Sequence, residues 1–189
     1  MKFLLLAFLA GLVSACGFEP WGLWPLTLAA FAALLHLIEQ APSLRSALAR
    51  GYWFGFGQFA LGLNWIATAF TFQSAMPVWL GWIAVVLLSF YLAVYPAMAG
   101  GLAWRWGRPD RLVLVLVFAA AWIVTEWLRA TMFTGFAWNP VGIALLPTPV
   151  AYVAKWVGTY GLSGIVLLVA GALLLFVGRQ WGERAPVGG

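Results

Sequence analysis

The sequence is poor in charge, cysteine and histidine. Only 8% of its 189 residues are charged and 65% are hydrophobic, whereas soluble domains carry about 25% charged residues. A soluble core of this length cannot hide so much apolar surface, so the sequence predicts a protein that sits in lipid. The single cysteine, Cys16, excludes an internal disulfide and a Cys-x-x-Cys motif. With His36 as the only histidine, a zinc site of clustered histidines and cysteines is not expected, and we expect no metal and no cofactor.

The charges that are present lie scattered between apolar blocks. Basic residues outnumber acidic ones by ten to five, but they form no basic run, so a nucleic-acid partner is not expected. If the chain crosses the membrane six times from a cytoplasmic N-terminus, only Arg129 and Lys155 lie outside. This asymmetry predicts that both termini are cytoplasmic. The basic residues on the cytoplasmic side are then Lys2, Arg45, Arg50, Arg105, Arg108, Arg111, Arg179 and Arg184.

The apolar blocks between charges and turn-forming residues predict six transmembrane helices. A hydrocarbon core of about 30 Å needs about 20 mostly apolar residues in each helix. The first two blocks are shorter than this, so they predict a hairpin that packs against protein. The expected helices are about 3–15, about 24–38, two between 51 and 104 with a turn at 73–77, one from 111 to about 129, and one from about 153 to 177.

The uncharged stretch 130–154 is predicted to be a loop and not a seventh helix. It contains Gly135, the pair Asn139-Pro140, Pro147 and Pro149, which remove helix donors and favour turns. The predicted fold is therefore an all-α integral membrane protein, a bundle of about six transmembrane helices with a short N-terminal helical hairpin and an irregular loop on the outer side. Residues 1–181 form one transmembrane domain, and 182–189 form a disordered cytoplasmic tail.

Five short motifs, spread over about nine tenths of the chain, follow one another in an order that resembles one family. The family is the apolipoprotein N-acyltransferases, which complete lipoprotein maturation in the bacterial inner membrane. The motifs are Gly17-Phe18-Glu19-Pro20-Trp21-Gly22-Leu23-Trp24-Pro25-Leu26, Gly55-Phe56-Gly57 with Gly62-Leu63-Asn64-Trp65, Glu126-Trp127-Leu128-Arg129, Thr134-Gly135-Phe136-Ala137-Trp138-Asn139, and Gly158-Thr159-Tyr160-Gly161-Leu162-Ser163.

The resemblance implies a multi-pass protein of the inner membrane whose irregular loop is periplasmic. Family members continue through a further helix into a periplasmic nitrilase-like domain, where a Glu-Lys-Cys triad forms a thioester with the acyl chain. That domain is absent here, so we expect the membrane half of a truncated or split acyltransferase that is not catalytic alone. Its expected partners are phospholipid, bacterial lipoproteins and a separately encoded catalytic domain.

Two other functions remain to be weighed. The chain could be a non-catalytic membrane scaffold or tether for a partner enzyme such as a polyprenol-phosphate mannosyl transferase, with which relatives of the family are joined or partnered. It could also be a small transporter, but the predicted spans carry no midplane charge and no inverted repeat. The transporter is therefore the weakest of the three.

The candidate binding residues lie near the outer end of the fifth predicted helix. Glu126 and Arg129 have the i,i+3 spacing of a pair on one helix face. The pair either only secures the helix end, or Arg129 holds a phospholipid headgroup while Glu126 orients it. Phe136 and Trp138 either rest in the membrane interface or line an acyl-chain groove, where Asn139 offers hydrogen bonds to a glycerol ester.

Polar residues elsewhere in the predicted spans suggest no catalytic group. Gln58 and Asn64 in the third helix are expected to form interhelical hydrogen bonds. The run Leu12-Val13-Ser14-Ala15-Cys16 looks like a lipoprotein signal, but its single preceding charge and the five later spans favour a retained helix. A triad of Cys16, Glu19 and Lys155 would lack the rigid strand scaffold that such chemistry needs, so no catalytic residue is predicted.

Overall fold

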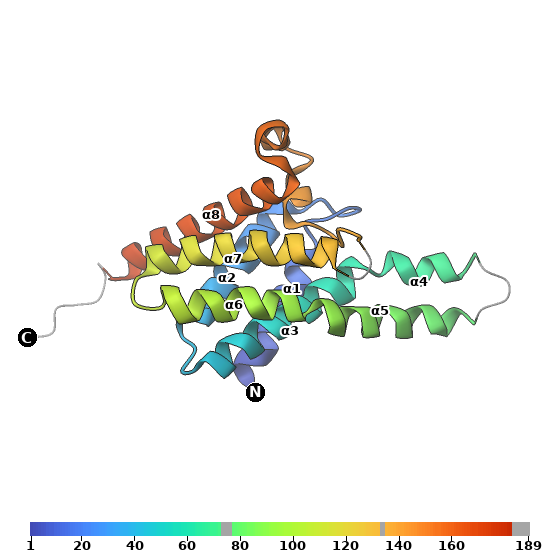
Figure 1. Cartoon of the computed structure of the whole chain (residues 1–189), viewed down its shortest axis with the longest axis horizontal. Coiled ribbons are helices and arrows are strands. Elements are labelled where there is room, and N and C mark those ends of the chain that lie inside the picture. The colour runs from blue at the N-terminus through green and yellow to red at the C-terminus, as the bar shows by residue number, and fades with distance from the viewer. Residues whose placement is uncertain (73–76, 133–134, 183–189) are drawn as a thin grey trace, which may run out of the picture.

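The protein is built from helices, and the prediction of an all-α membrane protein is confirmed (Figure 1). The computed structural model describes residues 1–72, 77–132 and 135–182, and these contain no strand. The turn expected at 73–77 and the tail expected at 182–189 fall largely outside the described residues. The elements are α1 (Lys2–Ala15), α2 (Trp24–Glu39), α3 (Leu44–Gly62), α4 (Trp65–Phe70), α5 (Val78–Leu92), α6 (Val94–Gly107), α7 (Arg111–Thr131), η1 (Val141–Leu145), η2 (Pro149–Val153) and α8 (Ala154–Gly182).

Among the described residues, three helical segments are long and apolar enough to cross a membrane, as judged by length and composition. They are Val78–Gly107, which runs through α5 and α6, Arg111–Thr131, which is α7, and Pro149–Gly178, which includes most of α8. α1 and α2 are shorter apolar helices of 14 and 16 residues, as the sequence predicted for the hairpin. α1 packs along α3 and α2 packs on α8, so each helix of the hairpin contacts protein as well as its hairpin partner.

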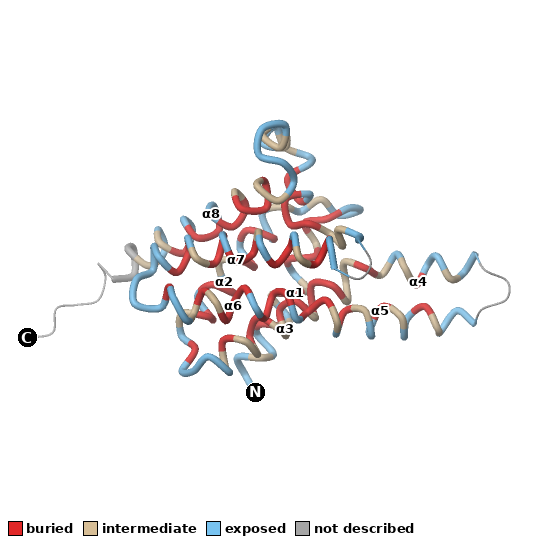
Figure 2. Tube along the Cα trace, viewed as in Figure 1, coloured by how far each residue is buried: buried red, intermediate tan, exposed pale blue. Residues whose placement is uncertain are grey.

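The two ends of the bundle differ in charge. α6 ends and α7 begins at an end that carries Arg105, Arg108 and Arg111, which we call the basic end. The opposite end, which carries the segments 16–23 and 139–147, we call the outer end. From the outer end the hairpin of α4 and α5 projects past the rest of the bundle (Figure 1), and its surface is largely exposed (Figure 2).

The third helix begins earlier than the sequence predicted. It starts at Leu44 and not near Gly51, because the hydroxyl of Ser43 caps it by accepting a hydrogen bond from the backbone N–H of Ser46. Arg50 therefore lies inside the helix, where it is buried and donates to the carbonyl oxygen of Leu37. The sequence predicts a helix boundary at the charge of Arg50, but this residue lies inside α3 and is hydrogen-bonded within the bundle.

An aromatic cluster fills the core between α2, α3 and α7. The ring of Phe31 on α2 lies 5.0 Å from the ring of Phe54 on α3 and 4.9 Å from that of Trp122 on α7, measured between centroids. Phe118 packs 5.5 Å from Trp122 in the same cluster. Figure 2 shows the buried residues concentrated where these helices meet. Edge-to-face contacts of this kind hold aromatic rings in defined orientations.

Close backbone approach joins α1 to α3. A Cβ added at Gly57 would collide with the carbonyl oxygen of Phe8, and one added at Gly11 would collide with that of Phe54. Small residues allow such approach between helices in lipid, where van der Waals contact and not the hydrophobic effect drives association.

The stretch 130–154 contains no membrane-spanning α-helix within its described residues, as predicted. After α7 ends at Thr131, the residues described before α8 begins at Ala154 form the short 3-10 helices η1 and η2 and no other helix. The backbone of α8 is then interrupted at Gly158, which has φ 71°. The prolines and glycines of this stretch therefore prevent a long helix, as the sequence predicted.

We predict that Gly57→Val destabilises the bundle, because the new side chain meets the α1 backbone. Overpacking of this kind costs about 2 kcal/mol, and thermal unfolding in detergent should show it as a drop of several degrees. Ala172→Val is the matched control, because Ala172 is exposed on α8. Equal midpoints for the two variants would contradict the close packing of α1 on α3.

Candidate functional site

A buried carboxylate organises the outer end. Glu126 lies on α7 about one turn before the helix ends, and it is 1% exposed. Its Oε1 accepts three hydrogen bonds, from Trp122 Nε1 at 3.3 Å, from Arg129 Nη2 at 3.3 Å and from the backbone N–H of Val141 at 2.9 Å. One oxygen therefore joins a core indole, a guanidinium and the outer loop.

The guanidinium of Arg129 is also enclosed. Its side chain is 1% exposed and lies over the ring of Phe59, 4.9 Å from the centroid. These contacts are those of a buried ion pair within the protein. A lipid phosphate reaches this group only if neighbouring side chains move, so headgroup binding by Arg129 stays a prediction.

The outer loop 139–147 is held at three points by three different helices. Asn139 Nδ2 donates to the carbonyl oxygen of Gly62 at the end of α3, at 2.8 Å. The N–H of Val141 donates to Glu126 on α7, and the N–H of Gly142 donates to Ser163 Oγ on α8 at 2.8 Å. A loop with these ties has a defined position relative to the bundle.

Backbone strain accompanies the first of these ties. Trp138 has φ 37° and Asn139 has φ 49°, in the left-handed region that bulky residues rarely adopt. Such conformations cost on the order of 1–3 kcal/mol each and persist only where the surroundings fix them. Here the bonds of Asn139 and Val141 supply that constraint.

An aromatic pair lies beside the ion pair. The ring centroids of Phe136 and Trp138 are 4.7 Å apart, and the ring planes are inclined at 64° to each other. Trp138 packs on a small buried cluster that contains Phe59 and Tyr95, whereas half of Phe136 is exposed. The structure thus brings the five predicted site residues to one end of the bundle, with Glu126, Arg129 and Asn139 turned to protein contacts and Phe136 turned outward.

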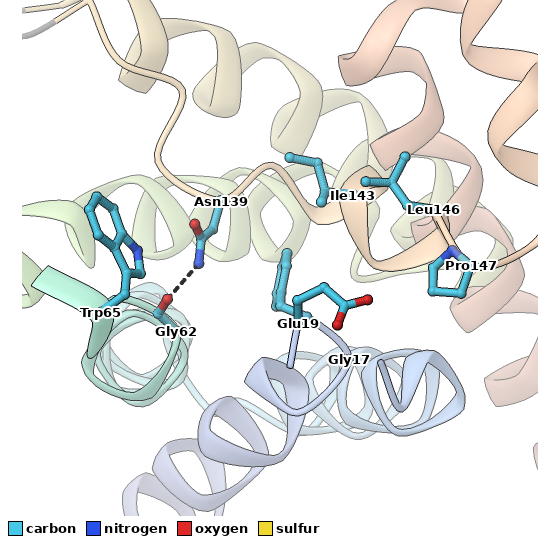
Figure 3. A pocket seen from close by; sticks show the side chains of 9 residues that line it. Gly17, Glu19, Gly62, Trp65, Asn139, Ile143, Leu146 and Pro147 are labelled. Atoms are coloured by element: carbon cyan, nitrogen blue, oxygen red, sulfur yellow. Dashed lines mark hydrogen bonds between the residues drawn. The ribbon is translucent and has the colours of Figure 1, made fainter. Parts of the chain in front are cut away.

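A pocket of about 400 Å³ opens at this end, between the α1–α2 connection, the α3–α4 junction and the outer loop (Figure 3). Of the lining residues that the structure describes, Glu19 alone has an ionisable side chain, and Asn139 borders the pocket through its contact with Gly62. The lining residues are Gly17, Phe18, Glu19, Gly62, Trp65, Asn139, Ile143, Leu146 and Pro147.

Sequence reasoning missed the way this pocket is assembled. Nothing in the spacing of Gly62, Ser163 and Glu19 indicates that they meet one loop, although each stands within a motif that marked the family resemblance. The hydrogen bond expected for Gln58 is wrong, because its amide is 2% exposed and has no partner among the described residues. Phe54, one turn earlier on the same face, packs on the aromatic core and leaves that face of α3 mostly apolar.

The three residues of the rejected triad remain separate in their contacts. The thiol of Cys16 donates to the carbonyl oxygen of Leu12, and the ammonium of Lys155 lies 5.3 Å from the ring centroid of Tyr152. Within the described residues, no hydrogen bond or ion pair links Cys16, Glu19 and Lys155. The described residues also hold no cluster of three metal-ligating side chains.

Comparison with known proteins gives a consistent result. Residues 10–172 match the family described as "Apolipoprotein N-acyltransferase N-terminal domain". The chain is 41% identical over 181 residues to an apolipoprotein N-acyltransferase of Ralstonia nicotianae, covering 93% of this chain and 34% of that protein. The corresponding enzyme of Caulobacter vibrioides is 38% identical over 97% of this chain and 35% of its own length. The chain therefore spans about a third of the length of the curated relatives that it matches.

We predict that Glu126→Ala strongly destabilises the protein and releases the outer loop. It leaves the guanidinium of Arg129 buried without its partner, which costs about 3–5 kcal/mol, and removes the acceptor of Val141. Thermal unfolding should show the loss, and hydrogen exchange of the backbone amides at 141–146 should accelerate.

The double variant Glu126→Met/Arg129→Met is the control, because it removes both charges together. It should be more stable than Glu126→Ala while still exchanging quickly at Val141. If Glu126→Ala unfolds at the wild-type temperature, the carboxylate does not organise this end.

Proposed function

The chain belongs to the apolipoprotein N-acyltransferase family and corresponds to the N-terminal domain of its members. We propose that it is the membrane domain that binds and orients the substrates of lipoprotein N-acylation. The reaction moves an acyl chain from a phospholipid to the amino group of a lipoprotein. The observation that carries the proposal is the outer-end pocket, which three distant parts of the chain build beside an aromatic pair.

The shape and lining of the pocket suit a lipidated substrate. Its volume of about 400 Å³ lies in the range of small-molecule sites, and most of its lining is apolar with few polar groups. Phe136, half exposed three residues before Asn139 of the lining, adds apolar surface at this end of the bundle. Phe136 and Trp138 contact acyl chains in this proposal, while Glu126, Arg129 and Asn139 hold the loop that presents them.

The charge at the pocket suits the acceptor. Glu19 is exposed and lines the pocket near Pro147, where its carboxylate is available to an ammonium group (Figure 3). The acceptor of N-acylation carries an amino group next to its lipid chains. An anionic side chain at an apolar pocket therefore complements both parts of that substrate.

The described residues do not provide an acylation nucleophile, so we propose that this chain alone is inactive. A thioester mechanism needs a thiolate with a positioned base, and the thiol of Cys16 is directed to a backbone carbonyl. The nucleophile is then supplied by a catalytic domain outside these residues, whether on the same protein or encoded separately. Phospholipid and lipoprotein are the substrates, and that domain is the protein partner.

A non-catalytic scaffold is the second candidate function. The observation that favours it is the projecting α4–α5 hairpin (Figure 1), whose exposed side chains include Trp65, Trp79 and Trp82. An uncharged aromatic surface of this kind suits a protein or membrane contact. A polyprenol-phosphate mannosyl transferase tethered by this hairpin would fit such a role.

We predict that the purified chain binds a fluorescent diacylated lipopeptide in detergent without acylating it. Leu146→Trp should weaken binding about tenfold, because Leu146 lines the pocket and a larger side chain fills it. Leu168→Trp is the matched control, an exposed leucine of α8 outside the pocket. Anisotropy measures binding and mass spectrometry detects any product. Equal binding by both variants, or acylation by the chain free of contaminating enzyme, would overturn the respective half of the proposal.

We also propose that the protein lies in the bacterial inner membrane with both termini cytoplasmic. The basic end then faces the cytoplasm and the outer end faces the periplasm, as charge asymmetry favours. Reporter fusions after Gly189 and within 139–147 should report opposite sides. The same side for both fusions would contradict this topology.

A further inference from the structure

A second hollow lies at the basic end of the bundle, away from the substrate pocket. It is a crevice of about 820 Å³ between α2 and α8, which we call the α2–α8 crevice. One wall is formed by Ala29, Ala33 and His36 on α2, and the other by Leu173 and Val177 on α8. None of its lining residues takes part in the outer-end site, so the function proposed above leaves this crevice unexplained.

The crevice owes its width to small side chains on one face of α2. Ala29 and Ala33 are one turn apart and His36 follows three residues later, so all three share a face. At 1.5 Å per residue they span about 10 Å along the helix. That is about two thirds of one leaflet's hydrocarbon, which is about 15 Å deep. The crevice is therefore an apolar slot that runs from the basic end toward the middle of the membrane.

A cation stands at the mouth of the slot. Arg111, the first residue of α7, donates through Nε to the carboxylate of Glu39 at the end of α2. Gly178 on α8 leaves room for the Nη1 edge, since any side chain there would collide with it. Arg111 remains 45% exposed, so its guanidinium is held in place by Glu39 and is still accessible from the membrane surface.

Helix stability does not account for this arginine. A cation in the first turn of a helix opposes the helix dipole, and the N-terminus of α7 is already capped by Asp110, which accepts from the N–H of Val113. Both the dipole and the guanidinium favour an anion at this place. Glu39 and the capping carboxylate of Asp110 offset part of that charge, while the side chain of Arg111 stays 45% exposed.

We propose that the α2–α8 crevice binds a phospholipid of the leaflet at the basic end, with its phosphate on Arg111 and an acyl chain along Ala29 and Ala33. A phosphate matches the planar fork of an arginine and makes charge-assisted hydrogen bonds with it. A slot that is charged at the membrane surface and apolar below has the polarity of a single lipid. The charge complementarity favours this occupant over an apolar helix or a second copy of the chain.

The test uses the purified full chain, stripped of lipid and titrated with phosphatidylglycerol in detergent under native mass spectrometry. Ala33→Trp should weaken binding about tenfold by filling the slot, and Ala33 is exposed, so the fold should tolerate the change. Ala172→Trp, at an exposed alanine of α8 outside the crevice, should bind as wild type does. Binding that is equal in Ala33→Trp and wild type would overturn the proposal.

The phosphate contact has its own pair of variants. Arg111→Gln should weaken binding about tenfold, whereas Arg108→Gln, which removes another exposed cation of the basic end, should not. Diacylglycerol with the same chains should bind wild type as weakly as phosphatidylglycerol binds Arg111→Gln. If Arg111→Gln proves unstable, Ala33→Trp and diacylglycerol carry the test. A wild-type dimer that Ala33→Trp dissociates without loss of lipid would show a protein interface instead.

Discussion

The carboxylate of Glu126 is the group on which the outer end depends. In lipid a buried charge is costly unless it is paired, and Glu126 meets this requirement through a guanidinium, an indole and a backbone N–H. The same three bonds place Arg129 over Phe59 and fix the start of η1 against α7. The position of the outer loop, and with it one wall of the pocket, follows from satisfying this one carboxylate.

Helix packing in lipid explains two features of the bundle. Polar hydrogen bonds join particular points, and small residues make the extended contacts between helices. Apolar side chains gain little by leaving lipid for protein, so close approach at Gly11 and Gly57 and hydrogen bonds such as Thr27 Oγ1 to the carbonyl of Ser14 specify the arrangement. Gly142 combines both effects, since it lies against α8 without room for a Cβ while its N–H donates to Ser163. The loop is thereby joined to the bundle as one of its packed elements.

The sequence predicts the helices better than the site. Apolar blocks give α1, α2, α7 and α8 nearly to their ends, and the prolines and glycines of 130–154 predict the irregular loop. The prediction that α3 starts after Arg50 is wrong, because Arg50 lies within the helix and donates a hydrogen bond to a backbone carbonyl inside the bundle. Spacing places Glu126 beside Arg129, but the bonds to Val141, Gly62 and Ser163 join segments far apart in the chain. Such contacts leave no local pattern, so neither the pocket nor the left-handed backbone at Trp138 is predictable from one sequence.

Two arginines that look alike in the sequence have opposite surroundings in the fold. Arg129 is 1% exposed and has a buried carboxylate on its own helix, so its charge is already balanced inside the protein. Arg111 is 45% exposed, and its carboxylate comes from the end of another helix. To bind Arg129, a ligand phosphate would have to be fully desolvated and to replace a buried carboxylate. To bind Arg111, it would only have to compete with a solvated surface ion pair, which contributes about 0–1 kcal/mol. Exposure and the position of the partner, more than the presence of an arginine, therefore decide which cation a lipid headgroup can use.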